Sequence, residues 1–388
     1  MRWFFVIFFA LYALLHLYFF LKLRRAFRPG LTVSILIGLN LVLLILSPVA
    51  ARMAARELIL PWAYPLNYAA YFWLAFIFLF CSTALFMDSL HGGFWLMEKM
   101  RKRKVRKKKK TKTVRSAFVV PALVALSICV YGYHEARDIQ VEHVEIPTHK
   151  LTERVRIAQI SDVHLGLIIR EDHLGRIADA IRKAQPDMLV STGDLVDADD
   201  GYLDGLEKPL QQINPRLGKF AVLGNHEFIW SEKSSMDFME KAGFRVLRAD
   251  SAAAGDRLIV AGVDDPAALF FTGARETDER RFLRSLPQEK FILLLKHRPM
   301  VDPAASGLFD LQLSGHTHKG QIFPFSILTW FYYPQHAGKL SVVDGSLLYA
   351  NRGAGTWGPP IRFLAPPEVT IIDLVPQAPL REQQRRYR

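Results

Sequence analysis

The stretch RVRIAQISDVH, residues 154–164, decides the fold class of this chain, because an apolar run typical of a buried strand ends in aspartate and histidine. Four further apolar runs end in polar clusters in the same way. They are DMLVST before GDLVD (187–197), KFAVL before GNHE (219–227), KFILLL before KHRP (290–299) and LQLS before GHTH (311–318). Short strands that each end in potential metal ligands predict an α/β domain.

A helix is expected between the first two of these strands, over residues 171–185. Its apolar side chains recur at helical spacing, at Leu174, Ile177, Ala178 and Ile181. A strand, a helix and a second strand in this order predict a βαβ unit. Open α/β sheets place their sites at the carboxyl ends of strands. We therefore expect the polar clusters to meet in one shared site.

These clusters supply the ligand types that two neighbouring divalent cations need, namely carboxylates, imidazoles and an amide. The candidate ligands are Asp162, His164, Asp194, Asn225, His297, His316 and His318. Two residues spaced one apart at a strand end, such as Asp162 and His164, can aim both side chains the same way. Gly193, Gly224 and Gly315 each precede a ligand segment, where glycine permits a tight backbone.

The first 136 residues have the composition of a membrane region. Four apolar stretches approach the roughly 20 residues that a helix needs to cross a bilayer. They cover residues 3–21, 31–50, 66–87 and 118–133. The fourth stretch is the shortest and contains Pro121. A cleaved signal peptide is the alternative for the first stretch, but it ends in Lys22, Arg24 and Arg25 without a small-residue cleavage pattern.

Lysine and arginine clusters set the expected orientation, since short loops rich in these residues stay on the cytoplasmic side. Such clusters lie at residues 22–28 and 99–115. With four crossings, the C-terminal domain is then expected outside the cytoplasm, attached to a cell inner membrane or plasma membrane. If the fourth stretch does not span, the domain lies in the cytoplasm. We interpret the run at 101–112 as a contact with anionic headgroups rather than with nucleic acid.

Composition limits the remaining possibilities. The chain has 388 residues and a formal net charge of +13, much of it in the run at 101–110. Its two cysteines, Cys81 and Cys129, fall inside apolar stretches, which excludes a disulfide framework or a Cys-rich zinc module in the globular region. We expect a transmembrane region at 1–136, a globular domain at 137–376 and a mobile basic tail at 377–388.

The motifs DVH, GDLVD, GNHE, KH and GHTHKGQ resemble, in order, the five signature blocks of calcineurin-like metallophosphoesterases, over residues 155–321. The stretches YANRGAGTWGPPIRF (349–363) and PPEVTIIDL (366–374) resemble the C-terminal block of the bacterial membrane-associated branch. This resemblance implies a four-layer α/β/β/α sandwich, here preceded by about four transmembrane helices. It also implies a metal-dependent phosphoric ester hydrolase of the phosphodiesterase type.

The resemblance further implies a role for each matching residue. One metal would be held by Asp162, His164 and His318, the other by Asn225, His297 and His316, with Asp194 bridging the two. His226 would orient the phosphate or protonate the leaving oxygen, and Asp197 would orient His226, although a turn or helix cap is the alternative for Asp197. The two cations, Mn, Fe or Zn, would lower the pKa of a shared water, whose hydroxide attacks a phosphodiester or phosphomonoester.

The substrate is open at this point. Arg352 and Lys319 are candidate phosphate contacts, and the alternatives are a structural salt bridge and a solvent-facing amine. An aromatic cluster follows the last block, at Phe323, Phe325, Trp330, Phe331, Tyr332 and Tyr333. Interior core is the default expectation for these rings, and a lip that contacts lipid is the alternative.

The lip motivates the hypothesis that the substrate is a membrane lipid or a cell-envelope phosphodiester. Two alternative functions remain, a UDP-2,3-diacylglucosamine pyrophosphohydrolase, whose substrate is cytoplasmic, and a non-catalytic membrane scaffold. A scaffold would be indicated by missing ligands, and none is missing. Besides the membrane and a phosphoester substrate, we expect no nucleic acid and no obligate protein partner.

Overall fold

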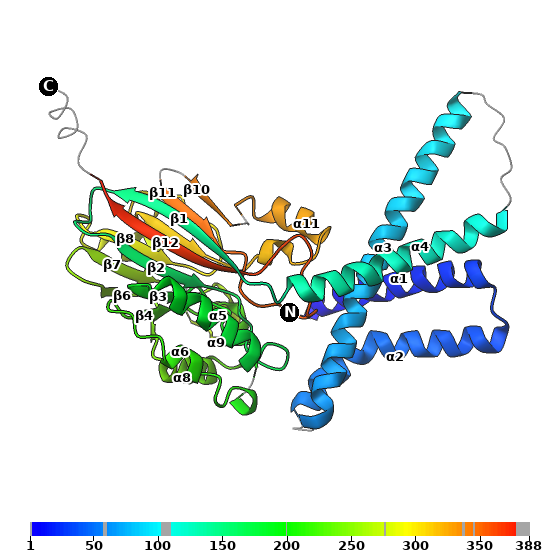
Figure 1. The fold of residues 1–388 in the computed structure, drawn as a ribbon, viewed down its shortest axis with the longest axis horizontal. Coiled ribbons are helices and arrows are strands. Elements are labelled where there is room, and N and C mark those ends of the chain that lie inside the picture. Colours follow the sequence, from blue (N-terminus) through cyan, green and yellow to red (C-terminus); the bar gives the residue numbers. More distant parts are fainter. Residues whose placement is uncertain are drawn as a thin grey trace. The chain divides into compact units, whose positions relative to one another are not determined.

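A computed structural model describes residues 2–56, 60–101, 110–198, 200–274, 277–335, 338–343 and 346–377 (Figure 1). The chain divides into two compact units, Met1–His134 with Gly358–Ile361, and Glu135–Trp357 with Arg362–Arg388. Most of the polybasic run (102–109) and of the predicted tail (378–388) lies outside the described residues. Headgroup contact and tail mobility therefore stay predictions.

The first unit consists of four long helices. They are α1 (Arg2–Phe27), α2 (Leu31–Arg56), α3 (Leu60–Met100) and α4 (Lys110–Glu135). Each contains a segment long and apolar enough to cross a membrane, at Val6–Phe27, Leu31–Ala54, Trp62–Met100 and Val114–Glu135. The prediction of four such helices is confirmed, including the fourth, which continues through Pro121.

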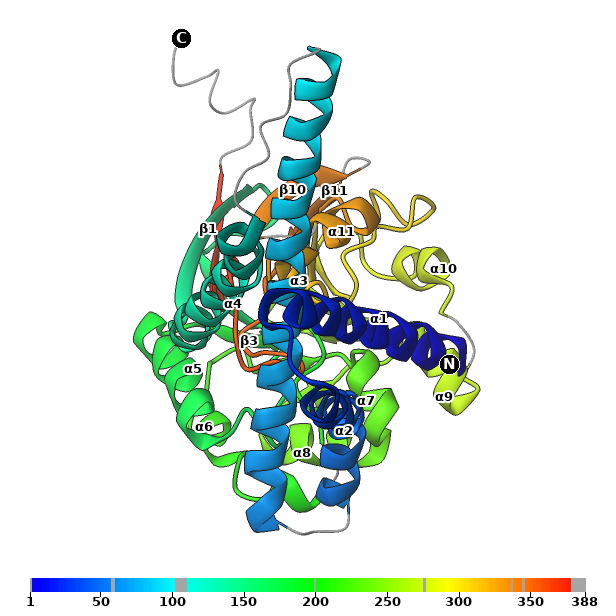
Figure 2. The same ribbon diagram turned by 90° about the vertical axis from the view of Figure 1, so that its right-hand side faces the viewer.

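Helix α3 is much longer than the predicted stretch at 66–87. Its 41 residues extend over about 60 Å, roughly twice the hydrocarbon thickness of a bilayer. It packs against α1 and α2 (Figure 2). Asp88 of α3 accepts hydrogen bonds from Lys22 at 2.7 Å and from Tyr18 at 2.8 Å, both on α1. This paired charge lies one residue beyond the predicted apolar stretch.

The second unit is built on two six-stranded mixed sheets. The first sheet has β2 to β5 in parallel, while β12 runs antiparallel to β2 and parallel to β1. Its strands, in spatial order, are β1 (Gln140–Thr148), β12 (Glu368–Pro376), β2 (Val155–Ile160), β3 (Met188–Ser191), β4 (Lys219–Ala221) and β5 (Arg245–Val246). Helix α5 (Glu171–Ala184) connects β2 to β3 and buries the predicted apolar stripe, so the expected βαβ unit is confirmed.

The second sheet has four parallel strands, β11, β9, β8 and β7, and an antiparallel strand at each edge. In spatial order it contains β10 (Lys339–Val343), β11 (Ser346–Ala350), β9 (Leu311–Ser314), β8 (Phe291–Leu295), β7 (Leu258–Gly262) and β6 (Asp250–Ala253). The shorter elements are η1 (Asp200–Tyr202), α6 (Lys208–Gln211), α7 (Asn225–Trp230), α8 (Glu232–Lys241), α9 (Ala267–Thr272), α10 (Glu279–Arg284), η2 (His318–Gly320) and α11 (Phe325–Tyr332).

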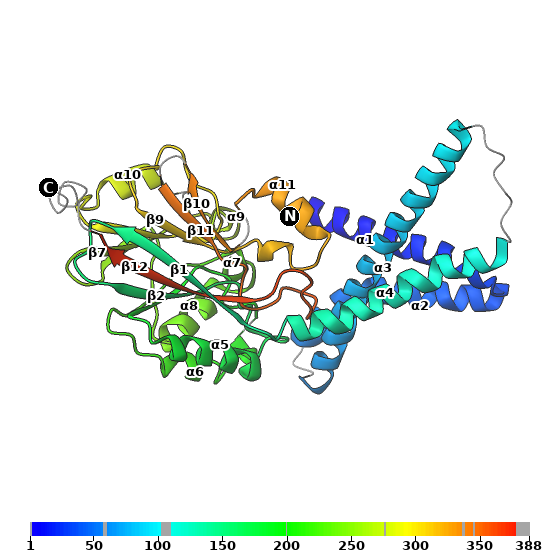
Figure 3. The ribbon, with the colours of Figure 1, turned by 45° about the horizontal axis from the view of Figure 1, so that its top comes forward.

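The main core lies between the two sheets. Val260 and Leu293 of the second sheet pack in one buried cluster with Ile157 of the first sheet. Their neighbours Ile259 and Ile292 point the other way, into a second cluster that includes the α10 side. This alternation is the two-residue period of a strand. With α5, α6 and α8 outside the first sheet and α10 outside the second (Figure 3), the predicted four-layer α/β/β/α sandwich is confirmed.

Candidate metal centre

The polar clusters of the sequence follow the carboxyl ends of five strands. Three of these strands, β2, β3 and β4, are parallel neighbours in the first sheet. The other two, β8 and β9, are parallel neighbours in the second sheet. The expectation of one shared site therefore holds across two sheets, because the sandwich brings the two carboxyl edges together.

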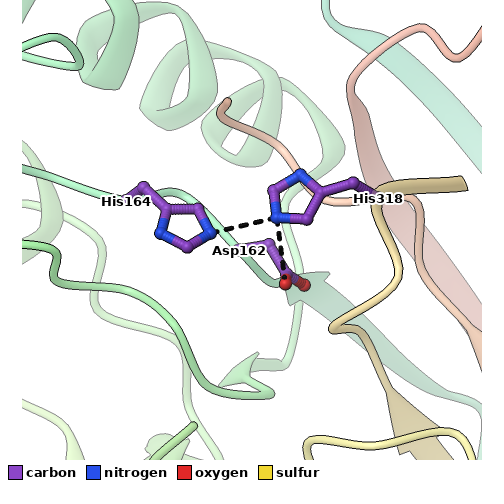
Figure 4. A group of neighbouring side chains, drawn as sticks. All are labelled: Asp162, His164 and His318. Atoms are coloured by element: carbon purple, nitrogen blue, oxygen red, sulfur yellow. Dashed lines mark hydrogen bonds and ion pairs between the residues drawn. The ribbon is translucent and has the colours of Figure 1, made fainter. Parts of the chain in front are cut away.

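One group of candidate ligands comprises Asp162, His164 and His318, all buried (Figure 4). The Nε2 atom of His318 lies 3.0 Å from Nε2 of His164 and 3.3 Å from Oδ1 of Asp162. The fold thus brings together His164 and His318, which are 154 positions apart in the chain. The grouping is the one that the family resemblance implies for the first metal.

A second group comprises Asp194, His297 and His316. The Nε2 atom of His297 lies 3.2 Å from Oδ2 of Asp194, 3.1 Å from Nδ1 of His316 and 3.3 Å from Oδ1 of Asn225. The same Oδ2 atom of Asp194 is 3.9 Å from Nε2 of His164. Asp194 therefore lies between the two groups, as expected of a bridging carboxylate. The structure brings all the predicted ligands together.

The spacing of these atoms fits metal ligation. Ligands bound at about 2.1 Å lie about 3.0 Å apart at the edge of an octahedron and about 3.4 Å apart in a tetrahedron, close to the separations here. Burial lowers the pKa of His316 to about 3 and that of His318 well below its usual value, so both rings keep a free lone pair. The Nδ1 atom of His297 donates to the Thr192 carbonyl at 2.8 Å, which directs Nε2 toward Asp194.

Backbone strain is concentrated at the same residues. Five of the predicted ligands have φ between 48° and 71°, in the left-handed region that non-glycine residues rarely adopt. They are Asp162, His164, Asp194, His316 and His318. Each such residue costs about 1–3 kcal/mol, and strain of this kind persists at functional sites because the surroundings hold it. Here the backbone N–H of His316 donates to both oxygens of Asp162 at 2.9 Å.

The three glycines before the ligand segments are required for two reasons. Gly193 has a φ of +93°, and a Cβ atom there would lie 2.7 Å from the Gly224 nitrogen. At Gly224 and Gly315 the limit is space alone, since a Cβ atom would approach within 2.2 Å of Asp194 Oδ1 and 2.1 Å of Asp162 Oδ2, respectively. Glycine at these two positions makes room for the carboxylates.

Glu227 braces the backbone of two ligand segments. Its buried carboxylate accepts hydrogen bonds from the N–H groups of Asp194 (3.0 Å), Val196 (3.0 Å) and Gly224 (2.7 Å). Burial, together with the nearby Asp194 carboxylate, raises the pKa of Glu227 to about 7. Glu227 therefore acts on the main chain of these segments and not on a ligand side chain.

His226 lies beside both groups and is held by Asp197. Its Nδ1 atom is 2.7 Å from Asp197 Oδ1, which also accepts a hydrogen bond from the Trp230 indole. Burial lowers the pKa of His226, but Asp197 and Asp194 outweigh this effect and raise it to about 9. Trp230 was not among the predicted site residues, although its position four residues after His226 on α7 places both on one helix face.

Arg362 is a second residue that the sequence did not single out. Its guanidinium is fully buried and donates to the carbonyls of Arg352, Gly353, Gly355 and Ala365. One of its nitrogens, Nη2, lies 3.1 Å from Nδ1 of His318. Burial lowers the pKa of Arg362 to about 9. This arginine ties the C-terminal glycine-rich loop to a predicted ligand.

The two predicted phosphate contacts have different surroundings. Arg352 donates from Nε to Glu368 at 2.5 Å and from Nη2 to Glu142. The guanidinium is thus held in a salt bridge with two carboxylates, which favours the structural alternative for Arg352, and its phosphate contact stays a prediction. Lys319 is half-buried and directly follows His318, so its phosphate contact stays a prediction.

Comparison with known proteins identifies the family. Residues 155–320 match the calcineurin-like phosphoesterase family. A metallophosphoesterase of Aquifex aeolicus is 38% identical over 255 residues, which are 65% of this chain and 97% of that protein. A transmembrane protein with metallophosphoesterase domain from Danio rerio is 31% identical over 271 residues, 66% of this chain and 62% of that protein.

The metallophosphoesterase YkuE of Bacillus subtilis is 30% identical over 262 residues, 63% of this chain and 90% of that protein. The chain belongs to the calcineurin-like metallophosphoesterase family. As a member it is a phosphoesterase of a metal-dependent class, and its four apolar helices make it a membrane protein.

Proposed function

We propose that this chain is a membrane-anchored phosphoesterase that hydrolyses phosphodiester or phosphomonoester bonds with two divalent cations. The observation that carries the proposal is the position of Asp194 between two buried His/Asp groups, with the His226–Asp197 pair alongside. Mixed nitrogen and oxygen ligands suit Mn, Fe and Zn alike. The complete set of ligands argues against the non-catalytic scaffold.

The roles of the chain's own residues follow from their contacts. When bound, the cations would act as Lewis acids toward the phosphoryl oxygens and lower the pKa of a water. Asp162, His164 and His318 would hold one cation, and Asn225, His297 and His316 the other. Asp194 would contact both.

His226 would supply the proton for the leaving oxygen. The bond from Nδ1 to Asp197 leaves Nε2 as the atom that can donate, and the Asp197 carboxylate raises the pKa of the ring, which favours its protonated form. Asp197 would therefore position His226, and Trp230 would position Asp197. Lys319, next to His318, would contact a phosphate oxygen.

We also propose that the substrate is a membrane lipid or a cell-envelope phosphodiester outside the cytoplasm. Chain length supports this, since only residues 136–139 separate α4 from β1. Four residues reach at most about 14 Å, so the chain cannot carry the start of β1 far from the end of α4. The proposed location of the globular unit outside the cytoplasm is based on the lysine and arginine clusters at 22–28 and 99–115.

Activity of the purified full-length chain, with added manganese and a nitrophenyl phosphodiester, tests the hydrolase. Asp194→Asn is expected to lose bound metal, measured by elemental analysis, together with turnover. His226→Ala is expected to keep the metal but lose roughly 100-fold or more in kcat. His149→Ala, an exposed histidine outside the site, is the control and is expected to match the wild type. Undiminished turnover in Asp194→Asn would refute the proposal.

A further inference from the structure

Helix α11 leaves its apolar side chains in solvent. No residue of this helix is buried, and the exposed fractions reach 62% at Leu328, 71% at Phe331 and 73% at Tyr332. The whole segment 321–335 carries no Asp, Glu, Lys or Arg. The default expectation that these aromatic residues form interior core is therefore wrong for all of them except Tyr333, which is buried. Contiguous apolar surface of this kind marks an interaction site.

This helix is fixed to the segment that carries two predicted ligands. It contacts η2, which begins at His318. At Gly320 of η2, φ is +75° and a Cβ atom would lie 2.4 Å from the Cα atom of Ser326, so the first turn of α11 rests directly on this glycine. Tyr333, which follows the helix, packs its ring edge-on to His316 at 5.4 Å. Whatever covers α11 therefore lies next to the metal centre.

Length and composition indicate what covers it. Eight residues span only about 12 Å, so α11 is too short to cross a hydrocarbon layer of about 30 Å. Tryptophan and tyrosine favour the membrane–water interface, and α11 contains Trp330 and Tyr332. Because segment 321–335 has no Asp, Glu, Lys or Arg, its apolar side chains can enter the acyl-chain region without carrying a charge out of water.

We propose that α11 lies in the interface of the bilayer that holds α1–α4, with its exposed side chains among the lipid acyl chains. The short connection between α4 and β1 keeps the globular unit within reach of that surface. Because α11 is packed on η2, its insertion presents the metal centre to lipid headgroups. An effect of α11 on catalysis rests on the proposed hydrolysis of a lipid substrate. Insertion of α11 into the bilayer does not depend on hydrolysis and can be measured without it.

A fluorescent reporter on α11 tests insertion directly. The full-length chain, with Cys81 and Cys129 replaced by alanine, receives a single cysteine through Leu328→Cys, labelled with an environment-sensitive dye and reconstituted in phosphatidylcholine vesicles. Nitroxides carried on the lipid chains are expected to quench this dye, and a water-soluble quencher is not. A matched label at Glu289→Cys, exposed on the globular unit, is expected to respond in the opposite way. The proposal is overturned if only the water-soluble quencher acts on the Leu328 label. It is also overturned if the label cross-links to a second copy of the chain and the lipid nitroxides do not quench it.

Activity distinguishes this inference from the proposed function. Phe331→Ser is expected to slow hydrolysis of a vesicle-borne phosphodiester roughly fivefold or more, with no change on a soluble nitrophenyl diester. Val141→Ser, an exposed apolar residue of β1, is the control. Equal losses on both substrates would contradict the membrane role. A chain whose Leu328 label inserts but which hydrolyses no phosphoester would refute the proposed function and leave the docking inference intact.

Discussion

Arg352 and Lys319 show how the environment of a cation decides its role. Arg352 is paired with Glu368 and Glu142 and links β1, β12 and the glycine-rich loop. Lys319 follows a predicted ligand and is half-buried. Removing a cation that is paired with a buried carboxylate such as Glu368 destabilises the fold, because the buried charge is left uncompensated.

Alanine is expected to change stability at Arg352 and substrate binding at Lys319. Arg352→Ala should lower the melting temperature, since Glu368 is fully buried and loses its positively charged partner, while KM of the folded fraction stays the same. Lys319→Ala should raise KM for a phosphodiester roughly tenfold, the cost of one charged hydrogen bond, with an unchanged melting temperature. Thermal melts and steady-state kinetics on both variants check this. A KM effect confined to Arg352→Ala would support its assignment as the phosphate contact.

At the scale of elements, one carboxylate adds side-chain bonds to the pairing of β12 with β2. Asp373 of β12 accepts hydrogen bonds from Arg154, which precedes β2, and from Arg156 within it. Burial raises the pKa of Asp373, but the two arginines outweigh it and the pKa is lowered overall. The charged form is therefore stabilised in the folded chain.

The Asp373 pairing predicts a pH-dependent stability. A lowered folded pKa means that the stabilisation is complete above the unfolded value of about 3.9 and is lost as the pH falls through the folded pKa. Asp373→Asn should unfold at lower denaturant concentration than the wild type at pH 7, and this difference should shrink below about pH 4. Asp179→Asn, which removes an exposed ion pair on α5, is the control and should change little. A constant difference from pH 7 to pH 3 would contradict the role of the charge.

At the scale of the whole molecule, the number of crossings determines which side the globular unit occupies. Four helices are long and apolar enough to span, so the N-terminus and the globular unit are expected on the same side. The lysine and arginine clusters predict that the loop at 22–28 lies in the cytoplasm. The pyrophosphohydrolase alternative requires the reverse arrangement, because its substrate is cytoplasmic.

Cysteine labelling in intact cells tests this orientation. In a chain without Cys81 and Cys129, Glu289→Cys should react with a membrane-impermeant maleimide without permeabilisation. Arg28→Cys, in the loop between α1 and α2, should react only after permeabilisation. The opposite pattern would place the globular unit in the cytoplasm and would favour the pyrophosphohydrolase.

Local patterns in the sequence were enough for the strands that lead into the site, for α5, for the spanning helices and for the candidate ligands. Short apolar runs marked β2, β3, β4, β8 and β9, because strands buried on both faces are apolar along their length, and the helical stripe marked α5, because burial of one helix face repeats with the helical period. The apolar stretches marked four spanning helices for the same reason. The candidate ligands could be identified because each lies just after an apolar run, and this position can be recognised in the sequence alone.

The tertiary structure alone decided the contacts between distant segments. Arg362 reaches His318, which precedes it by 44 residues, and Arg352 pairs with Glu142, which precedes it by 210 residues. No periodicity encodes such contacts, since they depend on how the two sheets and the C-terminal loop pack. The exposure of α11 is decided in the same way, because an apolar helix is core or surface according to what lies beside it. The sequence by itself determined the elements and the ligand types, and packing determined their partners.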